Sequence, residues 1–499
     1  AARATRGLLE RNPIGRAGLF RRARAEAAAR TRGHSPAVVR MLDVLDCYGR
    51  RGFRAAADLE ARLFGELVVS ETAARLVELF FAHTETKKQS GLEPGERATP
   101  APVSRVAVLG AGLLGAGIAC VSVKAGLEVR MRDRDDVAIA RGLRYAKDVL
   151  DARVRRGAMT ALERDAALAR LSGTMDHAGF RHTDLVVEAV FEDLELKHAV
   201  LAEIEALVRD DCVIASNTSA IPVARVAEGV ARPDRLLGMH YFGPVHRVPL
   251  VEIVRGEHTS ARAVATAVAV AKRQGKTAIV VRDGVGFYTT RALGPYLNEA
   301  AHLLAEGAKV DQIDEALVAW GFPMGPLHLL DEQGIDLAAH VASVAQAAFG
   351  ARLQVPAVLG ALRLDDRMGR KNGRGFYLYG RGERAEKRVD DTVYHAIGVV
   401  RRERLMAEEI QLRCTLALIN EALRCLDEGV LRTPQDGDVG AVLGLGFPAF
   451  RGGPFRYVDV LGAAEVLRRT RSLEQRLGAR FEPAPLLVEM ARRGKRFYG

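Results

Sequence analysis

A glycine-rich turn between a predicted strand and a predicted helix constrains the fold of this chain more than any other feature. The apolar residues 106–109 lead into Gly110, Gly112 and Gly115, after which the pattern becomes helical. In such a turn the first glycine permits a sharp bend, the second lets the backbone approach a pyrophosphate, and the third allows close helix–strand packing. The helix N-terminus adds free N–H groups and a partial positive charge. The turn therefore predicts a phosphate-binding loop at the start of an α/β domain.

The residues after this turn narrow the prediction to a dinucleotide. A second strand, predicted over 127–132, ends at Asp133. A carboxylate about 20 residues beyond the glycines can accept both ribose hydroxyls of NAD. The alternative is a structural turn followed by a solvated aspartate, because a chain with 49 glycines matches such a pattern easily by chance. The strand–helix–strand context favours the first interpretation, with NAD as the cofactor.

Composition excludes several other classes of protein. A hydrophobic content of 48% and a charged content of 27% are typical of a soluble globular protein, and no apolar run approaches the ~20 residues that span a bilayer. The five cysteines are scattered without a C-x-x-C pair, so we expect reduced thiols and no metal site. The net charge of +11 raises the question of nucleic acid. Arginine is spread along the whole chain without a recognisable DNA- or RNA-reading motif, so we predict no nucleic-acid partner.

The chain divides into five predicted segments. Residues 1–86 are predicted to be helical, and 87–102, with three prolines, to be a linker. In 103–283 strands alternate with helices, as in a parallel, right-handed βαβ sheet of Rossmann type. The remainder, 284–380 and 381–499, is predicted as two related all-α domains, because sequence pieces of the first recur in the second. The recurring pairs are Asn298-Glu-Ala300 with Asn420-Glu-Ala422, Gly321-Phe-Pro323 with Gly446-Phe-Pro448, Gly325-Pro326 with Gly453-Pro454, and Asp331 with Asp459.

Two serines predict helix starts within the N-terminal segment. Ser35 precedes Pro36, which pairs an N-cap residue with proline at the first helical position. Ser70 is predicted to cap a helix with an apolar face. That face comprises Leu76, Val77, Leu79, Phe80 and Phe81.

Three polar residues lie at or near the ends of predicted strands, where ligands bind in open α/β sheets. Ser219 ends the strand predicted over 213–219, and His240 and Glu252 lie near the ends of those predicted over 236–242 and 248–254. An NAD-linked oxidation of an alcohol needs a base for the hydroxyl proton, and histidine suits this task because its unperturbed pKa is ~6.5. A neighbouring carboxylate would orient the ring. The alternative interpretation is a structural histidine and a surface glutamate on an edge strand.

Together these motifs resemble the 3-hydroxyacyl-CoA dehydrogenase family. The resemblance extends over essentially the whole chain. Within the family, the chain is similar in particular to the α subunit of the multifunctional fatty acid oxidation complex. On this resemblance, 1–86 corresponds to the tail of an enoyl-CoA hydratase region whose main part is absent, followed by linker helices. The motifs that carry it are Gly110 to Gly115, Val187-Glu-Ala-Val-Phe-Glu-Asp-Leu-Glu-Leu-Lys197, Ser216-Asn-Thr-Ser219, Gly238-Met-His-Tyr-Phe242, Leu250-Val-Glu252 and Gly65-Glu-Leu-Val-Val-Ser70.

The resemblance implies a role for each matching position. His240 would be the catalytic base, Glu252 its partner, and Ser219 a contact to the substrate oxygen and the nicotinamide. Thr290 would lie at the substrate, where many members have Asn, and Gly243 likewise stands where many have Asn. No amide is therefore present at either place to donate to the thioester carbonyl. The implied cofactor-binding residues are Gly110, Gly112, Leu114, Gly115, Asp133, Glu192, Lys197, Ser219 and Lys371.

The function that the resemblance implies is NAD-dependent oxidation of L-3-hydroxyacyl-CoA to 3-ketoacyl-CoA in fatty acid β-oxidation. A thiolase β subunit and a second copy of the chain are the expected protein partners. The expected location is the cytoplasm of a bacterium or the mitochondrion of a eukaryote. Two alternatives stay open at this point: a Rossmann dehydrogenase of another small hydroxyacid, and a non-catalytic scaffold that docks a thiolase.

Overall fold

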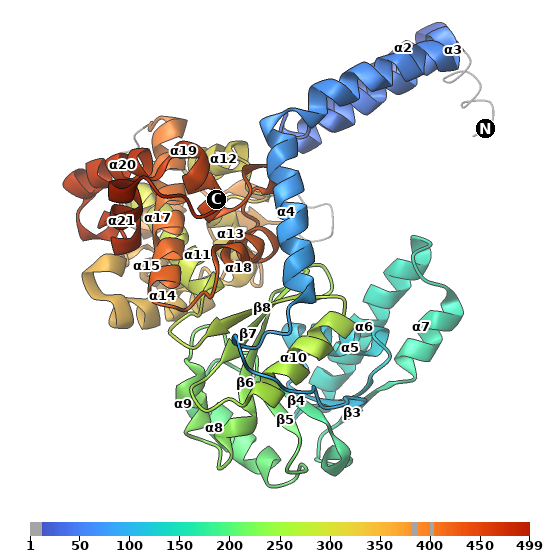
Figure 1. The fold of residues 1–499 in the computed structure, drawn as a ribbon. Coiled ribbons are helices and arrows are strands. Elements are labelled where there is room, and N and C mark those ends of the chain that lie inside the picture. Colours follow the sequence, from blue (N-terminus) through green and yellow to red (C-terminus); the bar gives the residue numbers. More distant parts are fainter. Residues whose placement is uncertain (1–11, 381–386, 400–403) are drawn as a thin grey trace.

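The computed structural model describes residues 12–380, 387–399 and 404–499 (Figure 1). A sheet domain occupies one part of the molecule and a helical body the other (Figure 1). Helix α4 (Glu71–Lys88) runs along the side of the helical body and reaches the sheet domain at its end (Figure 1). Within the described ranges, no helix combines the length and the apolar character that crossing a membrane requires.

The N-terminal segment is helical, as predicted, over the part that is described. Its helices are α2 (Pro13–Thr31), α3 (Pro36–Val68) and α4 (Glu71–Lys88). The α2–α3 hairpin projects from the body, whereas α4 packs on α18 and β8 (Figure 1). Ser70 caps α4 by accepting a hydrogen bond from the Ala73 N–H at 3.2 Å, as expected. Ser35 precedes the start of α3, but its side chain makes no capping hydrogen bond.

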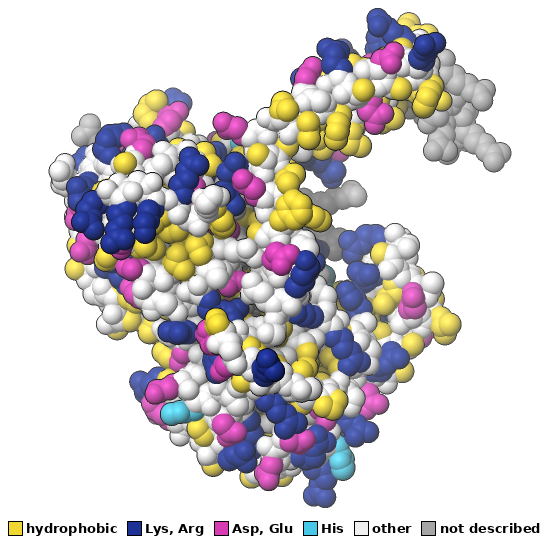
Figure 2. All heavy atoms as spheres, in the orientation of Figure 1, with side chains coloured by type: hydrophobic (Ala, Val, Ile, Leu, Met, Phe, Trp, Pro, Cys, Tyr) yellow, Lys and Arg dark blue, Asp and Glu magenta, His cyan; other side chains and the backbone are white. Residues whose placement is uncertain are grey.

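The apolar face predicted for α4 is largely solvent-exposed. Val77, Phe80 and Phe81 are 52%, 64% and 61% exposed, and Leu76 is 44% exposed. Only Leu79 packs partly against the core. Hydrophobic side chains line the projecting hairpin and α4 in the space-filling view (Figure 2). The spacing of apolar residues thus located a helix correctly, and most of the side chains on its apolar face are exposed.

An eight-stranded sheet forms the nucleotide domain, in the order β3-β2-β1-β4-β5-β6-β7-β8. Alternate residues of β1 (Arg105–Leu109) point to opposite faces of the sheet. Val106 and Val108 belong to one buried cluster, and Ala107 and Leu109 belong to the other. The strands are β1 (Arg105–Leu109), β2 (Glu128–Arg132), β3 (Leu171–Thr174), β4 (Leu185–Glu188), β5 (Val213–Ser216), β6 (Leu236–Tyr241), β7 (Leu250–Arg255) and β8 (Thr277–Arg282). The helices are α5 (Leu113–Lys124), α6 (Asp136–Arg155), α7 (Ala161–Leu168), α8 (Leu194–Glu205), α9 (Val223–Ala227) and α10 (Ala261–Arg273).

The sheet differs from the predicted one in two respects. It is not wholly parallel, because β6 and β7 pair antiparallel. Only residues 242–249 connect these strands, which is too short for the crossover of a dozen or more residues that a parallel pair needs. The edge strand β3 was also missed, since its sequence Leu171-Ser-Gly-Thr174 has no apolar run and only partial burial.

The helical part follows directly after β8. Its first unit contains α11 (Thr289–Ala305), α12 (Val310–Trp320), α13 (Pro326–Gln333), α14 (Ile335–Phe349), α15 (Val358–Leu364) and the short strand β9 (Tyr377–Tyr379). The second contains β10 (Lys387–Val389), α16 (Val393–Ala396), α17 (Ala407–Asp427), α18 (Pro434–Gly440), α19 (Pro454–Leu461), α20 (Ala463–Leu477) and α21 (Pro485–Arg493). The prediction of purely helical units was therefore slightly wrong, because β9 and β10 pair antiparallel.

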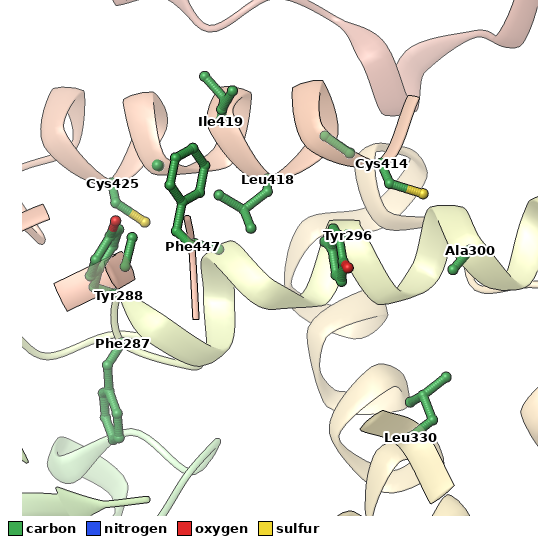
Figure 3. Packing of buried hydrophobic residues seen from close by; sticks show 14 of the residues in the cluster. Phe287, Tyr288, Tyr296, Ala300, Leu330, Cys414, Leu418, Ile419, Cys425 and Phe447 are labelled. Carbon is green, nitrogen blue, oxygen red and sulfur yellow. The ribbon is translucent and has the colours of Figure 1, made fainter. Parts of the chain in front are cut away.

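The internal repeat becomes a pseudo-twofold arrangement around α11 and α17, which pack along each other (Figure 3). Arg413 of α17 pairs at 2.6 Å with both Glu299 and Glu306 of α11 and its C-terminal end. Reciprocally, Arg291 of α11 pairs at 2.7 Å with both Glu421 and Glu428, one in α17 and one just after it. Removing one partner of a buried pair leaves an uncompensated charge and typically costs about 3–5 kcal/mol. These two clusters therefore join the two units at both ends of the α11–α17 contact.

A second set of repeated contacts fastens each unit internally. Asp314 accepts hydrogen bonds from the Leu327 and His328 N–H groups at the start of α13 and from the Tyr377 hydroxyl. In the second unit, Asp438 accepts from two N–H groups at the start of α19 and from the Tyr498 hydroxyl. Burial raises the pKa of Asp314 to about 6 and that of Asp438 to about 7.

Candidate active site

The glycine turn has the geometry that its sequence predicts. Gly110 adopts a φ of 100°, and a Cβ there would lie 2.5 Å from the Ala189 carbonyl oxygen. A Cβ on Gly115 would lie 1.9 Å from the Gly110 oxygen, which explains the need for glycine where α5 crosses β1. Gly112, by contrast, faces open space, and no side chain caps the helix that it precedes. This turn, called the glycine cradle below, leaves room at Gly112 beside a helix N-terminus without a side-chain cap, which fits a pyrophosphate.

Asp133 lies against this turn. Its Oδ2 accepts a hydrogen bond from the Ala111 N–H at 2.7 Å, and its Oδ1 accepts from the Arg134 N–H at 2.8 Å. The side chain is half-buried at the end of β2. A carboxylate in this position adjoins the glycine cradle, where a nucleotide ribose would lie. The residues present therefore fit a dinucleotide with free ribose hydroxyls.

His240 and Glu252 are direct neighbours across the antiparallel pair β6–β7. The His240 Nδ1 lies 3.0 Å from Glu252 Oε2, and the two residues are 3% and 0% exposed. Because a carboxylate only accepts hydrogen bonds, Nδ1 carries the proton in the neutral ring and Nε2 keeps its lone pair. The antiparallel register, which the sequence analysis did not foresee, is what joins the two residues.

Glu252 is also held by the N-terminus of α11. Its Oε1 accepts from the Tyr288 and Thr289 N–H groups at 2.9 and 3.2 Å, and Oε2 accepts from the Thr289 hydroxyl at 2.6 Å. The chain turns into α11 through two successive residues of positive φ, Gly286 at 72° and Phe287 at 51°. This turn directs the Phe287 ring toward the sheet and Tyr288 toward α17 (Figure 3). The helix N-terminus thereby stabilises the negative charge of the buried carboxylate.

A second buried charge cluster supports the loop that carries Ser219. Lys197, which is 0% exposed, pairs with Glu188 at 2.9 Å and with Glu192 at 3.4 Å. Glu192 in turn accepts hydrogen bonds from the Thr218 hydroxyl and from the Ser219 N–H at 2.6 and 2.8 Å. Burial acts to raise the pKa of Glu192, but the Lys197 charge and these hydrogen bonds lower it overall. Lys197 and Glu192 therefore hold the Ser219 loop in place.

Comparisons with known proteins agree with this geometry. The family model described as 3-hydroxyacyl-CoA dehydrogenase, NAD binding domain, matches residues 105–284, and the corresponding C-terminal domain model matches 286–379 and 410–496. The chain belongs to the 3-hydroxyacyl-CoA dehydrogenase family. It is accordingly an NAD-dependent oxidoreductase, and its sheet domain is the NAD-binding domain.

Solved structures of relatives are similar to more than half of this chain. A 3-hydroxybutyryl-CoA dehydrogenase from Escherichia coli is 27% identical, with a TM-score of 0.68, and the match covers 79% of this chain and 99% of that one. The dehydrogenase part of multifunctional enzyme 1 from C. elegans is 25% identical, with a TM-score of 0.58, over 83% and 96%. An (S)-3-hydroxybutyryl-CoA dehydrogenase from Ralstonia eutropha is 35% identical, with a TM-score of 0.54, over 56% and 100%.

The remaining predicted residues of this dehydrogenase occupy different places. Leu114 is half-buried in the first turn of α5, and a Cβ on Gly243 would lie 3.7 Å from its side chain. Thr290 is half-buried as the second residue of α11, next to the residues that hold Glu252. The rings of Phe242 and Phe287 pack on His240 with centroids 4.4 and 5.9 Å away. These two rings form an apolar wall beside the imidazole.

Lys371, which was predicted at the cofactor, lies in the helical part of the chain. It is half-exposed, pairs with Asp336 of α14, and lies on the loop between α15 and β9. Across the described ranges, no hydrogen bond or ion pair joins Lys371 to the nucleotide domain. A role at the cofactor stays a prediction that these contacts do not support.

Sequence reasoning missed two residues that organise the site, Glu188 and Thr289. Glu188 accepts from the Ser216 hydroxyl at 2.5 Å as well as from Lys197. Its signal was present, because a charged residue ending a buried apolar strand is unusual unless it is paired. Thr289 offered no such signal, since its partner Glu252 lies far away in the sequence and on another element.

Proposed function

We propose that this dehydrogenase oxidises the 3-hydroxyl group of an L-3-hydroxyacyl-CoA to a ketone in fatty acid β-oxidation. The observation that carries the proposal is the buried His240–Glu252 pair at the end of β6, held at 3.0 Å. The segment after β6 packs on α5, the helix that begins at the glycine cradle, because Val245 contacts Gly117 closely. The pair and the cradle are thus held by neighbouring elements, as a reaction between substrate and cofactor requires.

In this proposal the chemistry divides between cofactor and protein. When bound, NAD supplies the hydride acceptor. His240 accepts the hydroxyl proton at Nε2, and Glu252 stabilises the imidazolium that forms. The Ser219 hydroxyl, placed by the Glu192 contact to its backbone, donates to the substrate oxygen. Phe242 and Phe287 keep water from the imidazole, which strengthens its pairing with the carboxylate.

The same proposal extends to the neighbouring steps of the pathway. A 3-hydroxyacyl-CoA is formed by hydration of an enoyl-CoA, and its 3-keto product is a substrate for thiolytic cleavage. We propose that residues 1–86 correspond to the tail of a hydratase region followed by linker helices, and that the chain works beside a thiolase subunit. The similarity to the dehydrogenase part of a multifunctional enzyme supports this placement. On this view the 499-residue chain does not itself hydrate enoyl-CoA.

The test is NADH formation by the purified chain with L-3-hydroxyacyl-CoAs of graded chain length. The free 3-hydroxyacids and the D-enantiomers of the thioesters serve as matched substrates. We expect turnover with the L-thioesters and little with either control. Equal turnover with a free hydroxyacid would contradict the proposed substrate class. Turnover of an enoyl-CoA to the hydroxyacyl-CoA would contradict the assignment of the N-terminal segment.

A further inference from the structure

Thr289 holds both oxygens of the Glu252 carboxylate. Its N–H donates to Oε1 at 3.2 Å and its hydroxyl donates to Oε2 at 2.6 Å. The residue is 0% exposed, so no bulk solvent competes for either bond. As the first residue of α11, it has no carbonyl of a preceding helical turn to which its hydroxyl could donate instead.

The oxygen that accepts the Thr289 hydroxyl is the one that faces the imidazole. Glu252 Oε2 lies 2.6 Å from Thr289 Oγ1 and 3.0 Å from His240 Nδ1. Two donors therefore share one carboxylate oxygen in a site without water competition. A hydrogen bond to a charged acceptor stabilises the charge. The Thr289 hydroxyl therefore weakens the tendency of the Glu252 carboxylate to hold His240 in its protonated form.

Few other titratable groups face this pair. Among the described residues, Tyr288 and Cys425 are buried neighbours that interact electrostatically with Glu252. The Tyr288 hydroxyl donates to the Gly437 carbonyl at 2.8 Å and so points away from the carboxylate. Burial raises the pKa of both groups, so both stay neutral in the physiological range. On the other side His240 meets the apolar rings described above.

We propose that Thr289 is a positioning residue that sets the pH range in which His240 can accept the substrate proton. The hydroxyl favours the state in which Glu252 is charged and His240 is neutral. Without it, the pair binds a proton at higher pH, whichever of the two residues takes the proton. This role rests on the proposed function for its kinetic consequence, but the coupling between the three side chains does not.

The experiment compares Thr289→Val, which keeps the branched shape but loses the hydroxyl, with Thr289→Ser, which keeps the hydroxyl. We expect the acidic limb of the kcat/KM profile to move up by about 0.5–1 pH unit in the valine variant, because one charge-assisted hydrogen bond is lost. The serine variant should restore the wild-type limb. Thr470→Val is the matched control, since this buried hydroxyl donates only to its own helix, at Val466. Its profile should not move.

A second readout does not require turnover. The titration of the His240 imidazole, followed by nitrogen NMR with His240→Gln for assignment, should move in the same direction in the valine variant. The proposal would be overturned if the His240 titration had the same midpoint in the wild type and in Thr289→Val. It would also be overturned if Thr289→Ser shifted that midpoint as much as Thr289→Val does. Thr289→Ala serves if the valine variant does not fold. Absence of turnover in the wild type would instead overturn the proposed function and leave the NMR comparison decisive for Thr289.

Discussion

Replacing Glu252 by glutamine tests the proposed pair most directly, because the structure shows what the substitution changes. Glutamine has nearly the same shape, but one carboxylate oxygen becomes an NH₂ donor. Placed at the Oε1 position, this NH₂ would face the Tyr288 and Thr289 N–H groups, which cannot accept. Placed at Oε2, it faces His240 Nδ1 and a hydroxyl, both of which can become acceptors. The second orientation is therefore favoured.

That orientation reverses the imidazole tautomer. When the amide NH₂ of the Glu252→Gln variant donates to Nδ1, the neutral His240 ring carries its proton on Nε2 and has no lone pair for the substrate. Correct tautomers are worth about 10⁴-fold in a serine protease triad, and general-base catalysis typically contributes ~10²–10⁴-fold. We expect Glu252→Gln to lower turnover by roughly 10²–10⁴-fold. Loss of the negative charge should also move the acidic limb of the pH–rate profile to lower pH.

The assay is steady-state NADH formation over a pH series, with circular dichroism and thermal unfolding to verify folding. Glu299→Gln is the matched control, because Glu299 is 1% exposed and paired with Arg413 but lies in the helical units. The control should lose stability without a change in the pH limb. A folded Glu252→Gln enzyme with near-normal turnover and an unmoved limb would refute the role of this carboxylate.

Three further variants test other parts of the protein. His240→Ala should lower turnover about 10²–10⁴-fold in the same assay with NAD affinity little changed, and an active variant would end the catalytic assignment. Asp133→Asn should weaken NAD binding and reduce the preference for NAD over NADP, because the Asp133 carboxylate repels the 2′-phosphate of NADP. A wild-type enzyme that prefers NADP would contradict this. Asp438 has a pKa of about 7 in the folded chain against 3.8 as its ordinary value, so its contribution to stability is complete below pH 3.8 and is lost as pH rises through 7. The unfolding temperature of Asp438→Asn should therefore depend less on pH between about 4 and 7 than that of the wild type does. The same change of unfolding temperature with pH in both proteins would show that Asp438 does not cause this pH dependence.

Much of the nucleotide site could be predicted because its determinants are local. The glycine cradle, the strand before it and the helix after it depend on backbone conformation within a few residues. Asp133, Ser219 and His240 could be chosen as candidates because strand ends converge on one edge of an α/β sheet, whatever the details of packing. The repeat in 284–499 could also be recognised, since the duplicated units keep residues that make the same contacts. Asp331 and its counterpart Asp459 each accept hydrogen bonds from two successive backbone N–H groups of their own unit.

The contacts that complete the site were decided by tertiary structure. Whether Glu252 meets His240 depends on the antiparallel register of β6 and β7, which a connection as short as 242–249 imposes. That Thr289 reaches the same carboxylate depends on the turn from β8 into α11, which passes through the positive φ of Gly286 and Phe287. Such partners lie far apart along the chain, so no local pattern records them. The sequence alone determined which side chains stand at strand ends, whereas packing of distant segments determined which of them touch.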